Sequence, residues 1–239
     1  MEKLDVHKGI IYYTDSRIDD PIKSVVMKQL LLTELPIVSV SLEEMNFGRN
    51  IVVEGERGYI TYTKQIVTAL EWSSAEYVFF CEHDVLYHQS HFDFTPPRDD
   101  TYYYNTNDWR WDYPNDRLIR YDGLTSLSQL CVNRKLALDQ FKRRLAKIKE
   151  LGEEAFSTRE PDIARKWGYE PGTKKTRNGG FSDDKSERWQ SEFPNIDIRH
   201  KGTFSPPKTT LESFKHLPTG WVETKVDLIE GWKLKEILQ

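Results

Sequence analysis

The first third of the chain alternates between strand and helix patterns, and this alternation limits the possible folds more than any other feature. Short apolar runs rich in β-branched and aromatic residues cover residues 9–14, 37–41 and 77–81. Between them, apolar residues recur at helical spacing over residues 22–32 and 59–72. The order strand, helix, strand, helix, strand is typical of βαβ units with parallel strands and right-handed crossovers. We therefore predict an α/β fold with a Rossmann-type, mostly parallel sheet flanked by helices.

The rest of the chain does not continue this alternation. Residues 99–122 are dense in Tyr, Trp, Asn and Asp, and we interpret them as a long surface hairpin or loop. Residues 127–132 and 196–200 have strand-like patterns, and residues 134–150 predict a helix with a basic outer side. An antiparallel or irregular region is therefore expected beside the parallel sheet.

Composition indicates a soluble globular protein. Of the 239 residues, 38% are hydrophobic and 30% are charged, which suits one compact domain and excludes a disordered chain. The net charge of −4 argues against a general polyanion binder, although residues 134–149 and 165–177 are locally basic. No apolar run reaches the length of a membrane span, and the N-terminus does not resemble a signal peptide. We expect a cytoplasmic protein with no membrane insertion, whose Cys81 and Cys131 are buried thiols.

Two polar clusters follow strand patterns at the edge where ligands bind in open parallel sheets. The first cluster consists of Thr14, Asp15, Ser16 and Arg17. The second is the triplet Glu82-His83-Asp84 after the run at 77–81. If the strand continues, Glu82 and Asp84 share one side and could hold one divalent cation between them. Taken alone, the triplet is more simply explained as an ordinary strand end that meets a polar loop.

The segment from Tyr77 to His88 resembles the DxD segment of glycosyltransferases with the GT-A fold. In that family the polar end of the first strand, here residues 14–17, contacts the nucleotide, and a helix precedes the DxD strand, as residues 57–72 do here. The likeness covers about the first 90 residues. It implies a nucleotide-sugar donor, with a UDP-sugar as first choice, contacted by residues 14–17 and Glu82.

The same resemblance implies a metal site. Members of the fold commonly supply a C-terminal histidine to the metal, and residues 194–205 are similar to that segment, with His200 at the matching position. The implied ligands are Asp84, Glu82 and His200, with His83 pointing away. Mixed carboxylate and imidazole ligation favours Mn²⁺ over Mg²⁺. Taken alone, His200 would be interpreted as a hydrogen-bonded surface histidine.

The acceptor side is harder to assign. Asp162 and Asp184 are candidates for the catalytic base of an inverting enzyme, although each carboxylate could equally cap a helix N-terminus. Candidates for stacking on an acceptor ring or base are Trp109, Trp111 and Trp189. Aromatic side chains packed under a loop are the alternative for each of the three.

We expect a single GT-A-like domain over residues 1–239, with a nucleotide-sugar-binding half at 1–95 and an acceptor-side half at 96–239. The small form is similar to bacteriophage, TET-associated glycosyltransferases that modify hydroxymethylated cytosine in DNA, which implies a modified-DNA acceptor and, for a phage protein, the host cytoplasm. A saccharide, lipid-linked or protein acceptor would suit the same residues.

Two other functions stay open. A nucleotidyltransferase also uses carboxylates and a divalent ion, but it normally has a glycine-rich loop after the first strand, and residues 14–17 contain no glycine. A non-catalytic carbohydrate- or nucleic-acid-binding module would not need Glu82, Asp84 and His200 to meet at one point.

Overall fold

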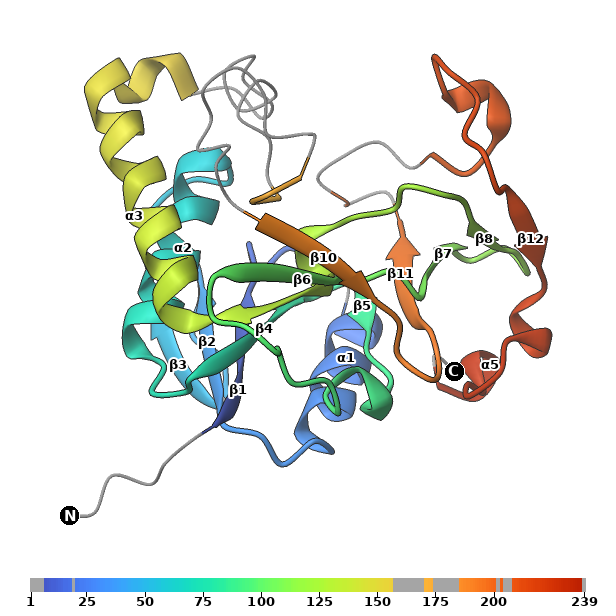
Figure 1. Cartoon of the computed structure of the whole chain (residues 1–239). Helices are drawn as coiled ribbons and strands as arrows, with labels where there is room; N and C mark the ends of the chain where they lie inside the picture. The colour runs from blue at the N-terminus through green and yellow to red at the C-terminus, as the bar shows by residue number, and fades with distance from the viewer. Residues whose placement is uncertain are drawn as a thin grey trace.

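A seven-stranded sheet forms the centre of the protein, in a computed structural model (Figure 1). The structure describes residues 7–18, 20–156, 170–173, 185–200, 203 and 208–237. In spatial order the strands are β10 (Lys185–Trp189), β6 (Thr101–Asn105), β9 (Leu130–Asn133), β4 (Tyr77–Glu82), β1 (Lys8–Tyr13), β2 (Ile37–Ser41) and β3 (Arg49–Val52). Neighbouring strands are parallel except where β9 runs antiparallel to β4 and β6. The predicted α/β class with a mostly parallel sheet is confirmed.

Helices cover both faces of this sheet. Helix α1 (Asp20–Leu31) packs on one face, against Ile10 and Tyr12 of β1. Helices α2 (Tyr59–Trp72) and α3 (Arg134–Leu151) pack on the other face, where Ile11 and Tyr13 of β1 point. Successive side chains of a strand point to opposite faces, so a strand covered on both sides must be apolar throughout. This explains the unbroken apolar run of β4.

A second, five-stranded sheet adjoins the first. Its order is β12 (Val222–Thr224), β8 (Leu118–Arg120), β7 (Asp108–Asp112), β11 (Asn195–Arg199) and β5 (Val85–Leu86). Strand β11 pairs parallel with β7 and antiparallel with β5, and β8 is antiparallel to β7 and β12. Because β5 follows β4 almost directly, its pairing with β11 brings the distant segment 195–200 beside the end of β4.

Short elements complete the described part of the chain. They are the 3₁₀ segments η1 (Gln89–His91), η2 (Leu127–Gln129), η3 (Glu153–Phe156), η4 (Leu211–Ser213) and η5 (Val226–Leu228), and the helix α5 (Leu234–Ile237). None of the helices in the described ranges combines the length and the apolar character that crossing a bilayer requires.

Only part of residues 99–122 forms the predicted surface hairpin or loop. Strands β7 and β8 form the hairpin, but β6 is a buried strand of the main sheet, with Tyr102, Tyr103 and Tyr104 at most 2% exposed. Three consecutive tyrosines fill both faces of a sheet with rings, although their hydroxyls make the sequence look polar. The strand predicted from residue 127 begins only at Leu130, and β3 was not predicted. Strands β6, β9 and β10 of the main sheet come from residues 96–239, the half of the chain that was expected to form the acceptor side.

Candidate functional site

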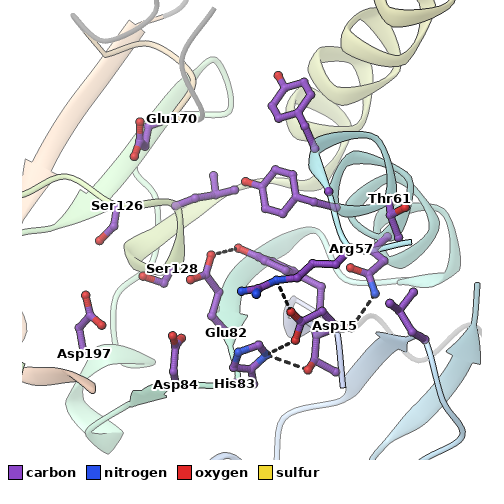
Figure 2. Close-up of a pocket in the computed structure, with 18 of the residues that line it drawn as sticks. Asp15, Arg57, Thr61, Glu82, His83, Asp84, Ser126, Ser128, Glu170 and Asp197 are labelled. Carbon is purple, nitrogen blue, oxygen red and sulfur yellow. Dashed lines mark hydrogen bonds and ion pairs between the residues drawn. The ribbon is translucent and has the colours of Figure 1, made fainter. Parts of the chain in front are cut away.

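A cavity of about 330 Å³ opens at the carboxyl ends of β1 and β4 (Figure 2). The ends of these strands supply one wall, and the start of α2 and the segment 125–128 supply others. The opposite wall comes from β7 and β11. Its charged lining residues are Asp15, Arg57, Glu82, His83, Asp84, Arg110, Glu170, Asp197 and Arg199. The position agrees with the rule that parallel sheets bind ligands beyond the carboxyl ends of their strands.

A potential metal site lies in the wall formed by the end of β4. His83, Asp84 and His200 each offer one ligand atom, and these atoms lie within 4.8 Å of one another. Oδ2 of Asp84 is 3.8 Å from Nε2 of His200, and both side chains are about nine-tenths buried. One carboxylate oxygen with two imidazole nitrogens is a donor set that fits a divalent transition-metal ion better than Mg²⁺.

Backbone pairing places these three residues. The amide of Ile198 in β11 donates to the carbonyl of Asp84 at 2.8 Å, which fixes the segment leading to His200 against the β4–β5 turn. His83 is oriented from the other side, where its Nδ1 lies 2.7 Å from Oγ1 of Thr14 at the end of β1. The predicted meeting of Asp84 with His200 is thus present in the fold.

The prediction named Glu82 as the third metal ligand and had His83 pointing away from the metal, whereas the third member of this cluster is His83. Spacing of two would align Glu82 with Asp84 in a continuing strand, but β4 ends at Glu82 and residues 83–84 form a turn. One ring nitrogen of His83 lies within 4.8 Å of the ligand atoms of Asp84 and His200, while Glu82 accepts a hydrogen bond from the hydroxyl of Tyr13 at 2.7 Å.

The two carboxyl groups of the triplet have different protonation. Burial, with a further contribution from the charge of Asp84, raises the pKa of Glu82 to about 8, so this carboxyl is largely protonated at neutral pH. Burial also acts to raise the pKa of Asp84, but a hydrogen bond from His200 and the charges of His83 and Arg199 outweigh it and hold that pKa below its usual value. Asp84 is therefore the ionised carboxyl of the pair.

The polar end of β1 is only partly in the cavity. Thr14 and Asp15 line it, whereas Ser16 and Arg17 do not, and Arg17 is exposed. Oδ2 of Asp15 pairs with Nε of Arg57 at 2.6 Å, an interaction that reaches from β1 to the start of α2. The sequence indicates Arg57 only as the start of a helix, because nothing in its local pattern distinguishes it from a solvated arginine.

The wall from β7 and β11 carries a group of charges that the sequence prediction missed. Nη1 of Arg199 lies 3.3 and 3.2 Å from the two carboxylate oxygens of Asp197, and Nε of Arg110 lies 3.8 Å from Oδ2 of the same carboxylate. Figure 2 shows Asp197 directed into the same space as Asp84 and Glu82. In the sequence, Asp197 and Arg199 alternate with two isoleucines that are buried in the structure. This alternation predicts that both charged side chains lie on the same face of a strand, and it is the signal by which they could have been found.

None of the three predicted acceptor tryptophans lines this cavity. Trp111 is 4% exposed in the core, Trp109 is half-buried against the same core, and Trp189 stacks on Phe94 and His91 beside a separate shallow hollow. Large indole rings are as useful in a core as at a binding surface, and sequence alone does not separate the two. The candidate bases Asp162 and Asp184 lie outside the described residues.

Comparison with known proteins identifies no family. No protein-family model matches the sequence. No curated protein matches it either.

Similar solved structures include a nucleotidyl transferase from Methanothermobacter, 9% identical, with a TM-score of 0.38 over 57% of this chain and 76% of the other. They also include the apo-form glycosyltransferase GlyE of Streptococcus pneumoniae, 8% identical, with a TM-score of 0.40 over 76% of this chain and 45% of the other. A third is a Drosophila β-1,4-galactosyltransferase 7 mutant in complex with manganese, UDP-Gal and xylobiose, 12% identical, with a TM-score of 0.38 over 61% of this chain and 62% of the other. The chain thus spans less than two thirds of the last two proteins.

Proposed function

We propose that this chain is a metal-dependent glycosyltransferase that takes its sugar from a nucleoside-diphosphate donor, a UDP-sugar in the first instance. The observation that carries the proposal is the cluster of His83, Asp84 and His200 in the wall of a cavity at the carboxyl ends of β1 and β4. A volume of about 330 Å³ lies within the range of sites that enclose a small molecule.

The three clustered side chains would hold a divalent ion, and two imidazoles among three ligands favour Mn²⁺ over Mg²⁺. The ion would supply Lewis-acid stabilisation of the diphosphate leaving group. Asp84 contributes the negative charge of the ligand set, since its depressed pKa keeps it ionised. Thr14 and Asp15 lie where the nucleoside end of the donor is expected, at the end of the first strand.

In the transfer, the bond between the anomeric carbon and the diphosphate oxygen breaks, and the acceptor hydroxyl oxygen forms the new bond. In an inverting reaction the hydroxyl proton passes to a carboxylate base. Asp162 and Asp184 are the bases proposed from sequence. The DNA acceptor implied by the phage-type resemblance is one candidate and a saccharide is another.

A thermal-shift experiment tests the donor site. The protein is melted with UDP, GDP, ADP or CDP, each with Mn²⁺, with Mg²⁺ or with EDTA. UDP with Mn²⁺ at about 100 times its Kd should stabilise the fold by about 2.7 kcal/mol, which corresponds to a rise of several degrees in Tm. The rise should be smaller with Mg²⁺ and absent with EDTA.

The same experiment, with nucleoside triphosphates beside the diphosphates, separates the competing functions. A response to no diphosphate under any metal condition would refute the donor site. A nucleotidyltransferase would instead bind a nucleoside triphosphate and release pyrophosphate from it. Such an enzyme is disfavoured because residues 14–17 provide no glycine-rich phosphate loop.

A further inference from the structure

Three aromatic side chains gather next to the charged wall of the cavity. The rings of Tyr121 and Trp221 stack with 5.8 Å between their centroids and 11° between their planes. Phe214 meets both rings edge-on, with centroids 5.1 Å from Tyr121 and 5.9 Å from Trp221. All three side chains are only partly buried. We call this group the aromatic platform.

The tertiary fold builds the platform from two distant segments. Strands β8 and β12 pair antiparallel with Arg120 opposite Val222, so Tyr121 and Trp221 face each other one residue beyond the last pair. The turn before Trp221 is fastened to the residue after Tyr121, because Asp122 exchanges hydrogen bonds with Thr219 at 2.8 and 3.1 Å. The two rings are therefore held in register by the backbone as well as by their own contact.

A continuous set of contacts joins the platform to the cavity. The guanidinium of Arg110 lies over the ring of Tyr121 at 5.1 Å, and its Nη1 donates to the Tyr121 hydroxyl at 2.5 Å. Nε of the same arginine is 3.8 Å from the Asp197 carboxylate, and Arg110 and Asp197 both line the cavity. The stacking order is thus Arg110, Tyr121, Trp221. In the parts of the chain that the structure describes, the only rings in contact with Trp221 are those of Tyr121 and Phe214.

The orientation of Trp221 is also constrained. Its indole Nε1 donates to Oε1 of Glu223 at 2.8 Å, and Glu223 lies 3.7 Å from Nη1 of Arg117. An indole with its N–H already satisfied presents an apolar face rather than a hydrogen-bond donor to a ligand.

The charges around the platform indicate the class of ligand. Residues 208–237 contain five lysines and five acidic residues, so this segment has no net charge to attract a polyanion. A DNA strand would be expected to meet a basic groove. A flat, partly buried aromatic ring beside a carboxylate and an arginine suits a neutral saccharide, which combines an apolar ring face with hydroxyls that need partners.

We infer that the Tyr121–Trp221 platform binds a neutral saccharide acceptor of two or more sugar rings, with one ring against Trp221 and a hydroxyl of another ring hydrogen-bonded to Asp197 at the cavity wall. The inference deepens the proposed function and rests on it, since it assigns an acceptor to the same site. It differs from the sequence prediction, which placed acceptor stacking on Trp109, Trp111 and Trp189.

The test uses the full chain with saturating UDP and Mn²⁺ and a panel of methyl glycosides, cellobiose and lactose. Saturation-transfer difference NMR detects which saccharides bind and gives their apparent Kd. Trp221→Leu should weaken saccharide binding about tenfold, while Trp221→Phe should restore most of it. The matched control is Trp72→Leu, since Trp72 is a 46% exposed indole on α2 that lies under the guanidinium of Arg49 and does not line the cavity.

The outcomes separate this inference from the proposed function. Saccharide binding that weakens in Trp221→Leu but not in Trp72→Leu supports the platform. Equal binding by wild type and Trp221→Leu overturns it, and so does absence of binding by every saccharide when UDP and Mn²⁺ still raise Tm. A single-stranded oligodeoxynucleotide carrying hydroxymethylcytosine is run in parallel, and Trp221-dependent binding of that probe overturns the saccharide class. If UDP and Mn²⁺ have no effect on Tm, the proposed function itself has failed, and the inference falls with it.

Discussion

The two walls of the cavity are positioned in different ways. On the wall formed by β1 and β4, Thr14 and Asp84 follow directly on buried parallel strands, and main-chain bonds such as Thr14 N to Val40 O at 3.1 Å set their places. On the wall formed by β7 and β11, strand pairing sets Arg110 beside Asp197, and the side chains of Arg110, Asp197 and Arg199 then orient one another through their charges. A side chain positioned by the backbone keeps its place when a neighbouring side chain is removed. A side chain oriented by a counter-charge loses stabilisation when that charge is removed. Substitutions in the first wall should therefore weaken ligand binding, and substitutions in the second wall should lower the stability of the fold.

The largest expected effect comes from removing the ionised ligand of the first wall. Asp84→Ala should abolish transfer and weaken Mn²⁺-dependent UDP binding by more than about 100-fold, the upper end of the loss for an outer-shell partner. Isothermal titration calorimetry with UDP and Mn²⁺ measures it. Asp116→Ala is the control, since Asp116 is a half-exposed aspartate that pairs with Lys235 and does not line the cavity. Retained metal-dependent binding in Asp84→Ala would place the metal elsewhere.

The second wall should respond through stability. Asp197→Asn removes the carboxylate that faces both Arg110 and Arg199 and should lower the free energy of unfolding by about 2 kcal/mol. This loss is smaller than that for a fully buried pair, because the negative charge of Asp197 also disfavours ionisation of Glu82 and Asp108. Burial and the charge of Asp197 both raise the pKa of these two carboxyls, so removing that charge favours their ionised forms. Mn²⁺-dependent UDP affinity should change by less than about threefold.

Urea denaturation at neutral pH measures this effect, and an exposed ion pair provides the control. Asp139→Asn breaks the Lys135–Asp139 pair on α3, whose side chains are 80% and 58% exposed, and should change stability by less than about 0.5 kcal/mol. If Asp197→Asn costs no more than Asp139→Asn, charge pairing does not hold the second wall.

A smaller effect distinguishes the two neighbours of Asp84. His83→Ala should weaken Mn²⁺ binding about tenfold, because His83 belongs to the cluster around Asp84. Glu82→Gln should leave it within about threefold, because the protonated Glu82 carboxyl bonds to Tyr13 instead. Electron paramagnetic resonance of free Mn²⁺ in the presence of UDP gives both affinities. The reverse order of effects would restore Glu82 as the ligand that the sequence predicted.

The smallest effect concerns the buried polar contacts behind the second wall. Nδ1 of His91 accepts hydrogen bonds from the side-chain amide groups of Asn105 and Asn195 at 3.0 and 3.1 Å, and burial lowers the pKa of His91 to about 3. The unfolded chain binds a proton near pH 6.5 and the folded chain does not. Stability should therefore fall as pH drops from about 6.5 toward 3, by at most about 1.4 kcal/mol per pH unit from this group.

His91→Asn keeps an acceptor near the position of Nδ1 and removes the titration. Urea denaturation between pH 7 and pH 4.5 should show a flatter dependence of stability on pH for this variant than for wild type. Parallel curves for the two proteins would show that His91 is protonated in the folded state, or that another group dominates the acid response.

The elements predicted well are those whose pattern is local. Helix α2 and strand β2 have the predicted bounds, since periodicity of 3.6 or 2 is written in consecutive residues. Thr14, Asp15 and Asp84 line the cavity, as expected from the rule that strand ends lie at the ligand-binding edge of a parallel sheet; their roles stay predictions. The metal-binding role of His200 is implied by resemblance rather than by pattern and stays a prediction; the structure places this histidine beside Asp84.

Other features depend on contacts between distant segments. The turn at residues 83–84 brings His83 into the cluster with Asp84 and His200, and the burial that protonates Glu82 comes from elements far along the chain. Asp197 faces the cavity only because β11 inserts between β7 and β5. Trp111 is in the core while Trp221, which no pattern singled out, stacks beside the cavity.

Local periodicity was sufficient for the α/β class and for one wall of the site, because a strand end needs only its own strand to define it. The second wall and the aromatic platform required the tertiary structure, because their residues meet only after β7, β8, β11 and β12 have paired. Burial then set which carboxyl is charged, and burial is a property of the assembled protein rather than of any segment of its sequence.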